Sequence, residues 1–320
     1  MSPSSPARAG NPDRIRRAAG AVIGSAVGDA LGAPFEFGPA GAFSARFPAA
    51  ESAGEMRGGG GWDAGEATDD TQMAVLVAES LLERHGLDLP DMFTRFQRWA
   101  AADPKDIGLQ TEDVLTNGLP WDRAAAHHFR TAQRAAGNGS LMRATTSAVY
   151  FARGSDETTM QAARRIAALT HGDPAAWEGT AVFHELVRVA LNGADPLAAV
   201  PAALAHVHPD HRGRYATVLA DDWHPDRATE FNGAVWPCLG SAVWAVRTTT
   251  SYEDAVRAAV DLGGDTDTVA AVAGGLAGAR YGVDAVPARW TEPLHVPLPG
   301  FDGRVLRAPD LVDLARRLAS

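Results

Sequence analysis

The chain has 320 residues, of which 46% are hydrophobic and 21% charged, a balance typical of a globular protein that buries a core. Its formal net charge of −10 and the lack of a long basic run exclude general nucleic-acid binding, which needs cations placed against phosphates. Cys238 is the single cysteine, so the sequence also excludes an internal disulfide and a cysteine-rich zinc site.

The N-terminal segment resembles an export signal only in outline. Residues 1–12 are rich in Ser, Pro and Gly, so we predict a disordered tail followed by one domain over residues 13–320. Basic residues at 14–17 then precede an apolar stretch at 18–31, the order found in signal peptides. That stretch is rich in Gly, carries Asp29 and is too short to span a bilayer. We therefore expect a cytoplasmic protein that does not bind membranes.

Apolar residues recur at helical spacing along most of the chain. In the stretch that starts at residue 15, Gly20, Gly24 and Gly28 stand four apart on one face, where another helix can approach closely. Residues 71–85 are apolar nearly all round and predict a buried helix that stops at Gly86. Further helices are predicted at residues 90–101, 124–135, 158–169, 175–191, 233–247, 252–262, 268–281 and 309–318. Because period-two strands rich in Val, Ile and Thr are missing, we predict an all-α fold in one domain.

Two acidic clusters stand immediately before predicted helices, at residues 68–71 (TDDT) and 263–268 (GGDTDT). One interpretation is helix capping, because Asp and Thr are preferred at N-caps and negative charge suits a helix N-terminus. A cap needs one oxygen, however, and each cluster holds two acids, which would repel each other near a buried helix start unless a cation lay between them. Hard divalent cations such as Mg²⁺ and Mn²⁺ bind several oxygen ligands. The two clusters together therefore predict a metal site.

Five short motifs occur in a fixed order along the chain, at residues 28–36 (GDALGAPFE), 68–73 (TDDTQM), 137–143 (GNGSLMR), 170–171 (TH) and 264–268 (GDTDT). Each motif alone is weak, but the five in order resemble the ADP-ribosylglycohydrolase family, including its DraG-like bacterial enzymes. The resemblance runs from about residue 14 to about residue 290, nearly the whole chain. It implies a single compact, orthogonal all-helical domain with two Mg²⁺ or Mn²⁺ ions at the bottom of a cleft.

The resemblance also implies which residues hold the metals. The implied ligands are Thr68, Asp69, Asp70, Asp265, Asp267 and Thr268, with Asp267 as the candidate to bridge both ions. Glu36 matches an acidic residue of the family that lies close to the metals and to the substrate ribose. We expect Phe35 and Phe37 to give Glu36 a partly buried setting; the alternative is a solvated glutamate at a helix end. Either Glu36 or a metal-bound aspartate such as Asp69 or Asp70 would be the general base or would position the water.

Other implied contacts concern the rest of the substrate. Gly137, Asn138, Gly139 and Ser140 look like the family's diphosphate-binding turn, although such a turn alone is a commonplace loop. His171 resembles the family histidine near the ribose, whereas an isolated histidine is more often a hydrogen-bonded core residue. Asp106 looks like the acid of a DraG-type loop that faces the departing group and would receive a guanidinium; the alternative is a turn acid after Asp103.

The function implied is hydrolysis at C1 of the distal ribose of ADP-ribose, reversing ADP-ribosylation. The acceptor stays open among arginine, serine, a nucleic-acid end, O-acetyl-ADP-ribose and other small conjugates. The partner is therefore an ADP-ribosylated protein or a small-molecule conjugate, and we expect a monomer. The alternatives are an ADP-ribose-binding module that no longer hydrolyses, a structural protein that reuses the fold, and another metal-dependent nucleotide hydrolase. The last is disfavoured because the chain has no P-loop.

Overall fold

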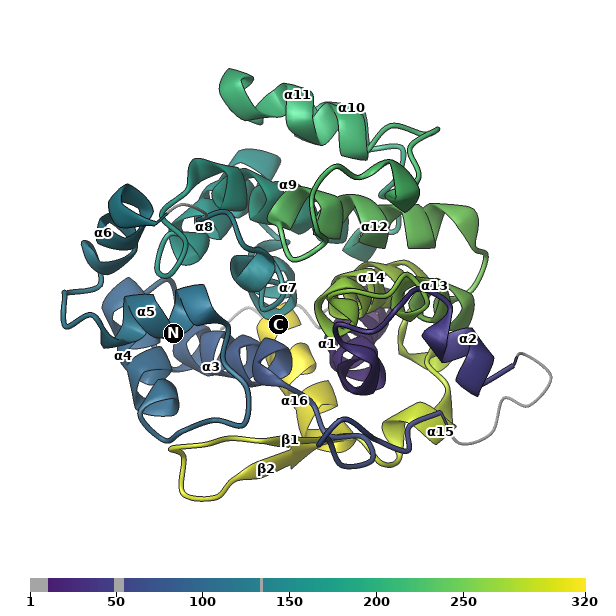
Figure 1. The fold of residues 1–320 in the computed structure, drawn as a ribbon. Helices are drawn as coiled ribbons and strands as arrows, with labels where there is room; N and C mark the ends of the chain where they lie inside the picture. Colours follow the sequence, from purple (N-terminus) through teal and green to yellow (C-terminus); the bar gives the residue numbers. More distant parts are fainter. Residues whose placement is uncertain (1–10, 49–54, 133–134) are drawn as a thin grey trace, which may run out of the picture.

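The computed structural model describes residues 11–48, 55–132 and 135–320, and these residues are overwhelmingly helical (Figure 1). The helices and 3₁₀ turns before residue 170 are α1 (Pro12–Gly32), η1 (Ala33–Phe35), α2 (Ala42–Arg46), α3 (Asp69–Glu83), α4 (Leu89–Ala100), α5 (Leu109–Thr116), α6 (Ala124–Thr131), η3 (Asn138–Ser140), α7 (Thr145–Phe151) and α8 (Asp156–Ala167). The remaining elements are α9 (Pro174–Leu191), α10 (Val200–Ala205), α11 (Pro209–Val218), η4 (Pro225–Arg227), α12 (Val235–Thr248), α13 (Tyr252–Val260), α14 (Thr266–Tyr281), η5 (Val283–Ala285), α15 (Ala288–Thr291), β1 (His295–Pro297), β2 (Val305–Arg307) and α16 (Ala308–Ala319).

The centre of the fold is the pair formed by α1 and α14, which lie side by side although they stand at opposite ends of the chain (Figure 1). Their backbones touch through small residues, as the glycine spacing predicts. A Cβ atom added to Gly20 would lie 2.3 Å from the carbonyl oxygen of Gly278, and one added to Gly28 would lie 2.0 Å from that of Ala270. Because no side chain fits there, the stripe of glycines sets how closely the two helices approach, and with it the distance between the site residues at their ends.

Other helices cover this central pair. Helices α9, α12 and α13 pack against α14, while α7 and α16 pack against α1. Helix α3 is buried along most of its length, as predicted, and runs between α7 and α4. The stretch Pro12–Phe35 is long and apolar enough to cross a membrane, but 94% of its apolar window is buried inside the protein. The stretch thus has the burial of a core helix.

The predicted all-α class is confirmed, with differences at the level of single elements. Every predicted helix is present, although α6 ends at Thr131 instead of residue 135, and α12 starts at Val235 instead of residue 233. The short helices α2, α5, α10, α11 and α15 were not predicted, because so few turns give little periodicity to detect. Two strands of three residues, β1 and β2, were not predicted; they pair antiparallel with His295 opposite Arg307. Of residues 1–12, predicted to be disordered, residues 1–10 lie outside the described residues, whereas Asn11 caps α1 and Pro12 begins it.

Candidate active site

A cavity of about 450 Å³ lies where the N-terminal ends of α3 and α14 face the loops that follow η1 and α4. Its wall brings together most of the residues that the sequence predicted for the site. The acidic and hydroxyl members are Glu36, Asp69, Asp70, Asp106, Asp265, Asp267 and Thr268. Gly137, Asn138, Gly139 and His171 line it as well. Two predicted residues, Thr68 and Ser140, are not part of the lining.

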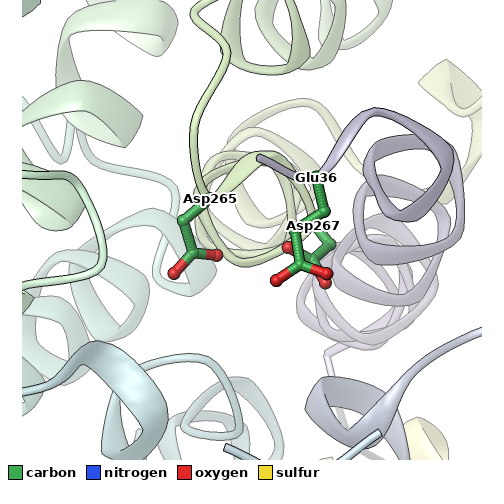
Figure 2. Close-up of side chains that lie close together, drawn as sticks. All are labelled: Glu36, Asp265 and Asp267. Carbon is green, nitrogen blue, oxygen red and sulfur yellow. The ribbon is translucent and has the colours of Figure 1, made fainter. Parts of the chain in front are cut away.

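Three carboxylates converge most closely. One oxygen of each of Glu36, Asp265 and Asp267 lies within 4.8 Å of the others, and Figure 2 shows the three side chains pointing into the same region. Glu36 follows η1, whereas Asp265 is the N-cap residue of α14 and Asp267 lies in the first turn of that helix. The loops are joined because Phe37 N donates to the Gly264 carbonyl at 2.6 Å and Gly264 N donates to the Gly38 carbonyl at 3.0 Å. This short bridge holds Glu36 against the start of α14.

The second acidic cluster forms the first turn of α3. The Asp70 carboxylate accepts from the Thr268 hydroxyl at 3.4 Å through Oδ1, while its Oδ2 is buried and has no hydrogen-bond partner in the part of the chain that the structure describes. The Thr68 hydroxyl caps α3, because it accepts from Asp70 N at 3.3 Å. Capping, the alternative interpretation of the sequence, thus describes Thr68, while Asp69 and Asp70 face the cavity.

Asp29, a residue of α1, holds the first turn of α3 in place, a role that the sequence analysis did not assign. Its fully buried carboxylate accepts from Thr68 N at 3.1 Å, from Thr71 N at 3.2 Å and from the Thr71 hydroxyl. It therefore satisfies donors at the start of α3 that no helical carbonyl can reach. The feature of the sequence that could have indicated this role is an aspartate inside an otherwise apolar helix.

Burial and mutual repulsion raise the pKa values of the acidic side chains that line the cavity. The pKa of Glu36 rises to about 8, first because of desolvation and then because of the charges on Asp106 and Asp265. Desolvation, followed by neighbouring carboxylates, also holds the pKa values of Asp69, Asp70 and Asp267 well above their usual range. Carboxyl groups packed this closely can all be ionised only when positive charge lies beside them. An all-oxygen donor set with an unpartnered buried oxygen therefore fits hard divalent cations such as Mg²⁺ and Mn²⁺.

The predicted diphosphate-binding turn, residues 137–140, lies partly in the cavity wall and partly in the core. Gly137, Asn138 and Gly139 face the cavity, and the Asn138 side-chain amide donates to Asp265 Oδ2 at 2.9 Å. The Ser140 hydroxyl instead lies 3.1 Å from the Thr180 hydroxyl in the core. Gly137 and Gly139 leave room for the His171 ring, because a Cβ added to Gly139 would lie 3.3 Å from His171 Nε2.

Exposed aromatic side chains stand at the mouth of the cavity. Glu36 is partly buried, as expected, and Phe35 beside it is buried, whereas Phe37 is 72% exposed. The Phe37 ring stacks on Phe231, with centroids 6.3 Å apart and an angle of 24° between the planes. Asp106 lies half-buried in the same wall, and its pKa is raised by burial and by the charge on Asp265. The mouth thus combines aromatic faces with an acidic group.

Known proteins resemble this chain along nearly its whole length. The family model described as ADP-ribosylglycohydrolase matches residues 10–320. The ADP-ribosylarginine hydrolase Tri1 of Pseudomonas putida (strain GB-1) is 31% identical over 289 residues, which cover 87% of this chain and 74% of that protein. The ADP-ribosyl-[dinitrogen reductase] glycohydrolase of Rhodospirillum rubrum is 29% identical over 88% of this chain and 90% of its own. A solved structure named "ADP-ribosylglycohydrolase-related protein complex" superimposes with a TM-score of 0.76 at 36% identity, covering 97% of this chain and 99% of that chain.

Proposed function

Because the chain belongs to the ADP-ribosylglycohydrolase family, we propose that it hydrolyses the bond between C1 of the distal ribose of ADP-ribose and a modified acceptor. The observation that carries this proposal is the meeting of Glu36, Asp265 and Asp267 within 4.8 Å in a cavity that Asp69 and Asp70 also line. A volume of about 450 Å³ is within the range of small-molecule sites. The domain that carries the site is proposed to extend over residues 13–320.

The acidic side chains are proposed to hold two Mg²⁺ or Mn²⁺ ions. The proposed ligands are Asp69, Asp70, Asp265, Asp267, Thr268 and, through the second lone pair of its capping hydroxyl, Thr68. The unpartnered Oδ2 of Asp70 and the raised pKa values of the aspartates support this set. When bound, the ions supply positive charge that holds the ribose hydroxyls and orients a water molecule.

Glu36 is the proposed general base. The oxygen of a water molecule bonds to C1 while the bond from C1 to the acceptor breaks, and the water proton passes to the Glu36 carboxylate and then to the leaving group. A base works best when its pKa lies near the operating pH, and the pKa of Glu36 is raised to about 8 by burial and by the charges on Asp106 and Asp265; positive charge from bound ions would lower it. Asp69 and Asp70 stabilise the positive charge that develops on the ribose in an oxocarbenium-like transition state.

The proposed acceptor is arginine on a protein. A guanidinium is cationic and planar, so it suits both the half-buried Asp106 and the aromatic faces of Phe37 and Phe231 at the mouth of the cavity. The name of the Pseudomonas putida relative, an ADP-ribosylarginine hydrolase, supports the same acceptor. We further propose that the protein acts as a monomer in the cytoplasm.

A panel of substrates tests the acceptor. ADP-ribose release is measured from proteins modified on arginine, from proteins modified on serine and from O-acetyl-ADP-ribose, at equal concentrations with Mn²⁺. We expect the arginine-linked substrate to be hydrolysed fastest and Asp106→Asn to reduce that preference. Faster release from serine or from the acetyl ester would overturn the arginine assignment. Binding of ADP-ribose without release from any substrate would instead indicate a binding module.

A further inference from the structure

Arg143 is fully buried and forms no ion pair with a carboxylate among the described residues, which is an unusual setting for a guanidinium, although the charge on Asp69 partly offsets the lowering of its pKa by burial. Its Nη2 donates to the Thr170 hydroxyl at 2.7 Å, its Nη1 lies 3.8 Å from the Met73 sulfur, and its plane lies over the Phe96 ring at 4.8 Å. Its Nε has no hydrogen-bond partner among the described residues. The single strong hydrogen bond that Arg143 makes therefore goes to a neutral hydroxyl.

The Thr170 hydroxyl connects Arg143 to His171, because its oxygen also lies 2.8 Å from His171 Nδ1. A guanidinium only donates hydrogen bonds, so the hydroxyl must accept from Arg143, and its own hydrogen is free to be donated. If Nδ1 also donated to this oxygen, the hydroxyl hydrogen would be buried without an acceptor among the described residues. The Thr170 hydroxyl and His171 Nδ1 are both satisfied only when Thr170 donates to an unprotonated Nδ1.

The other nitrogen of His171 faces the cavity wall. A Cβ atom added to Gly137 would lie 3.5 Å from Nε2, and one added to Gly139 would lie 3.3 Å from it. The backbone of His171 is held in place because its N–H donates to the Ala167 carbonyl at 3.0 Å and the Trp177 indole donates to its carbonyl. Burial, together with the charge of Arg143, holds the pKa of His171 well below its usual range, so the ring is neutral and carries one hydrogen.

We propose that Arg143 and Thr170 are positioning residues that hold His171 as the tautomer with its hydrogen on Nε2, so that the cavity presents an N–H donor beside Gly137 and Gly139. Which atom of the substrate accepts a hydrogen bond from this N–H rests on the proposed function, under which it is a phosphate or ribose oxygen of ADP-ribose. A protonated Nε2 has no free lone pair, so His171 is neither a metal ligand nor a general base through that atom.

The tautomer is measured directly by two-bond ¹H–¹⁵N correlation NMR on the free, histidine-labelled protein, with His171→Gln used to assign the signals. We expect an unprotonated Nδ1 and a protonated Nε2 in the wild type and in Thr170→Ser, which keeps the hydroxyl. Thr170→Val, of nearly equal volume, removes the hydroxyl; we expect its Nδ1 signal to shift and its ADP-ribose affinity to fall about tenfold. A protonated Nδ1 in the wild type would overturn the proposal, and this result does not depend on how the variants fold. So would a Thr170→Val protein with the spectrum and affinity of Thr170→Ser.

These readouts separate the inference from the proposed function. The wild-type spectrum is recorded without substrate, so the tautomer stands or falls whether or not ADP-ribose is released. If Nε2 is protonated but ADP-ribose does not bind at all, the proposed function fails and the Arg143–Thr170–His171 arrangement stands.

Discussion

Replacing Glu36 by glutamine should stabilise the metal-free protein at neutral and alkaline pH. In the folded protein, burial and the charges on Asp106 and Asp265 raise the pKa of Glu36 from 4.5 to about 8. Below pH 4.5 this carboxyl is protonated in both the folded and the unfolded chain. Between pH 4.5 and 8 it ionises in the unfolded chain while the fold keeps it protonated, so rising pH favours unfolding. The contribution of Glu36 to stability is therefore lost across that window.

The size of this loss follows from the pKa difference. One pKa unit corresponds to about 1.4 kcal/mol, so the whole difference would amount to about 5 kcal/mol. Because Glu36 is only half-buried, water screens its neighbours, and we expect about 2 kcal/mol instead. Glu36→Gln has no ionisable group at this position and should keep that free energy of unfolding as the pH rises.

Urea unfolding in the presence of a chelator at pH 5, 7 and 9 measures the effect. The wild type should lose about 2 kcal/mol more than Glu36→Gln between the first and the last pH. The control is Glu292→Gln, which removes an exposed glutamate outside the cavity lining and should follow the wild type. Equal losses in the wild type and Glu36→Gln would show that the acids do not repel one another as their positions imply. Saturating Mn²⁺ should reduce the difference between the two proteins, because the ion offsets the same repulsion.

Three further predictions concern the metal site, the mouth of the cavity and the helix pair. Asp265→Ala and Asp267→Ala should each lower kcat at least about a hundredfold with unchanged far-UV circular dichroism; full activity in both would refute the two-metal assignment. Asp106→Asn should raise KM for an arginine-linked substrate more than it lowers kcat, and a kcat-only effect in steady-state kinetics would argue against leaving-group binding. Gly28→Ala should lower the free energy of unfolding by about 3 kcal/mol, because its Cβ would lie 2.0 Å from the Ala270 carbonyl oxygen; an unchanged melting temperature would contradict the close packing of α1 and α14.

Local patterns in the sequence predicted the features that depend on neighbouring residues. The spacing of Gly20, Gly24 and Gly28 indicated the close helix contact, because close approach leaves room for hydrogen alone at those positions. The two acidic clusters indicated helix starts, and both clusters do begin helices. These conclusions needed only periodicity and the chemistry of helix ends.

Features that depend on distant residues were harder to predict. The bridge between Gly38 and Gly264 brings Glu36 to Asp265, and nothing in either segment alone specifies that pairing. The resemblance to a family predicted Glu36 as a site residue, but the exposure of Phe37 was not predicted. Asp29 shows the same limit, because its role depends on the start of α3 lying against α1.

Chelation and reconstitution of the wild-type enzyme test the central claim most directly. A protein ADP-ribosylated on arginine is incubated with the enzyme in Mn²⁺, after removal of the ion with a chelator, and after Mn²⁺ is restored, with an Asp265→Ala/Asp267→Ala protein in parallel. The account predicts that ADP-ribose is released in the first and third conditions only, and never by the double variant. Release that persists at the same rate without the ion, or in the double variant, would contradict a metal-dependent hydrolase centred on Glu36, Asp265 and Asp267.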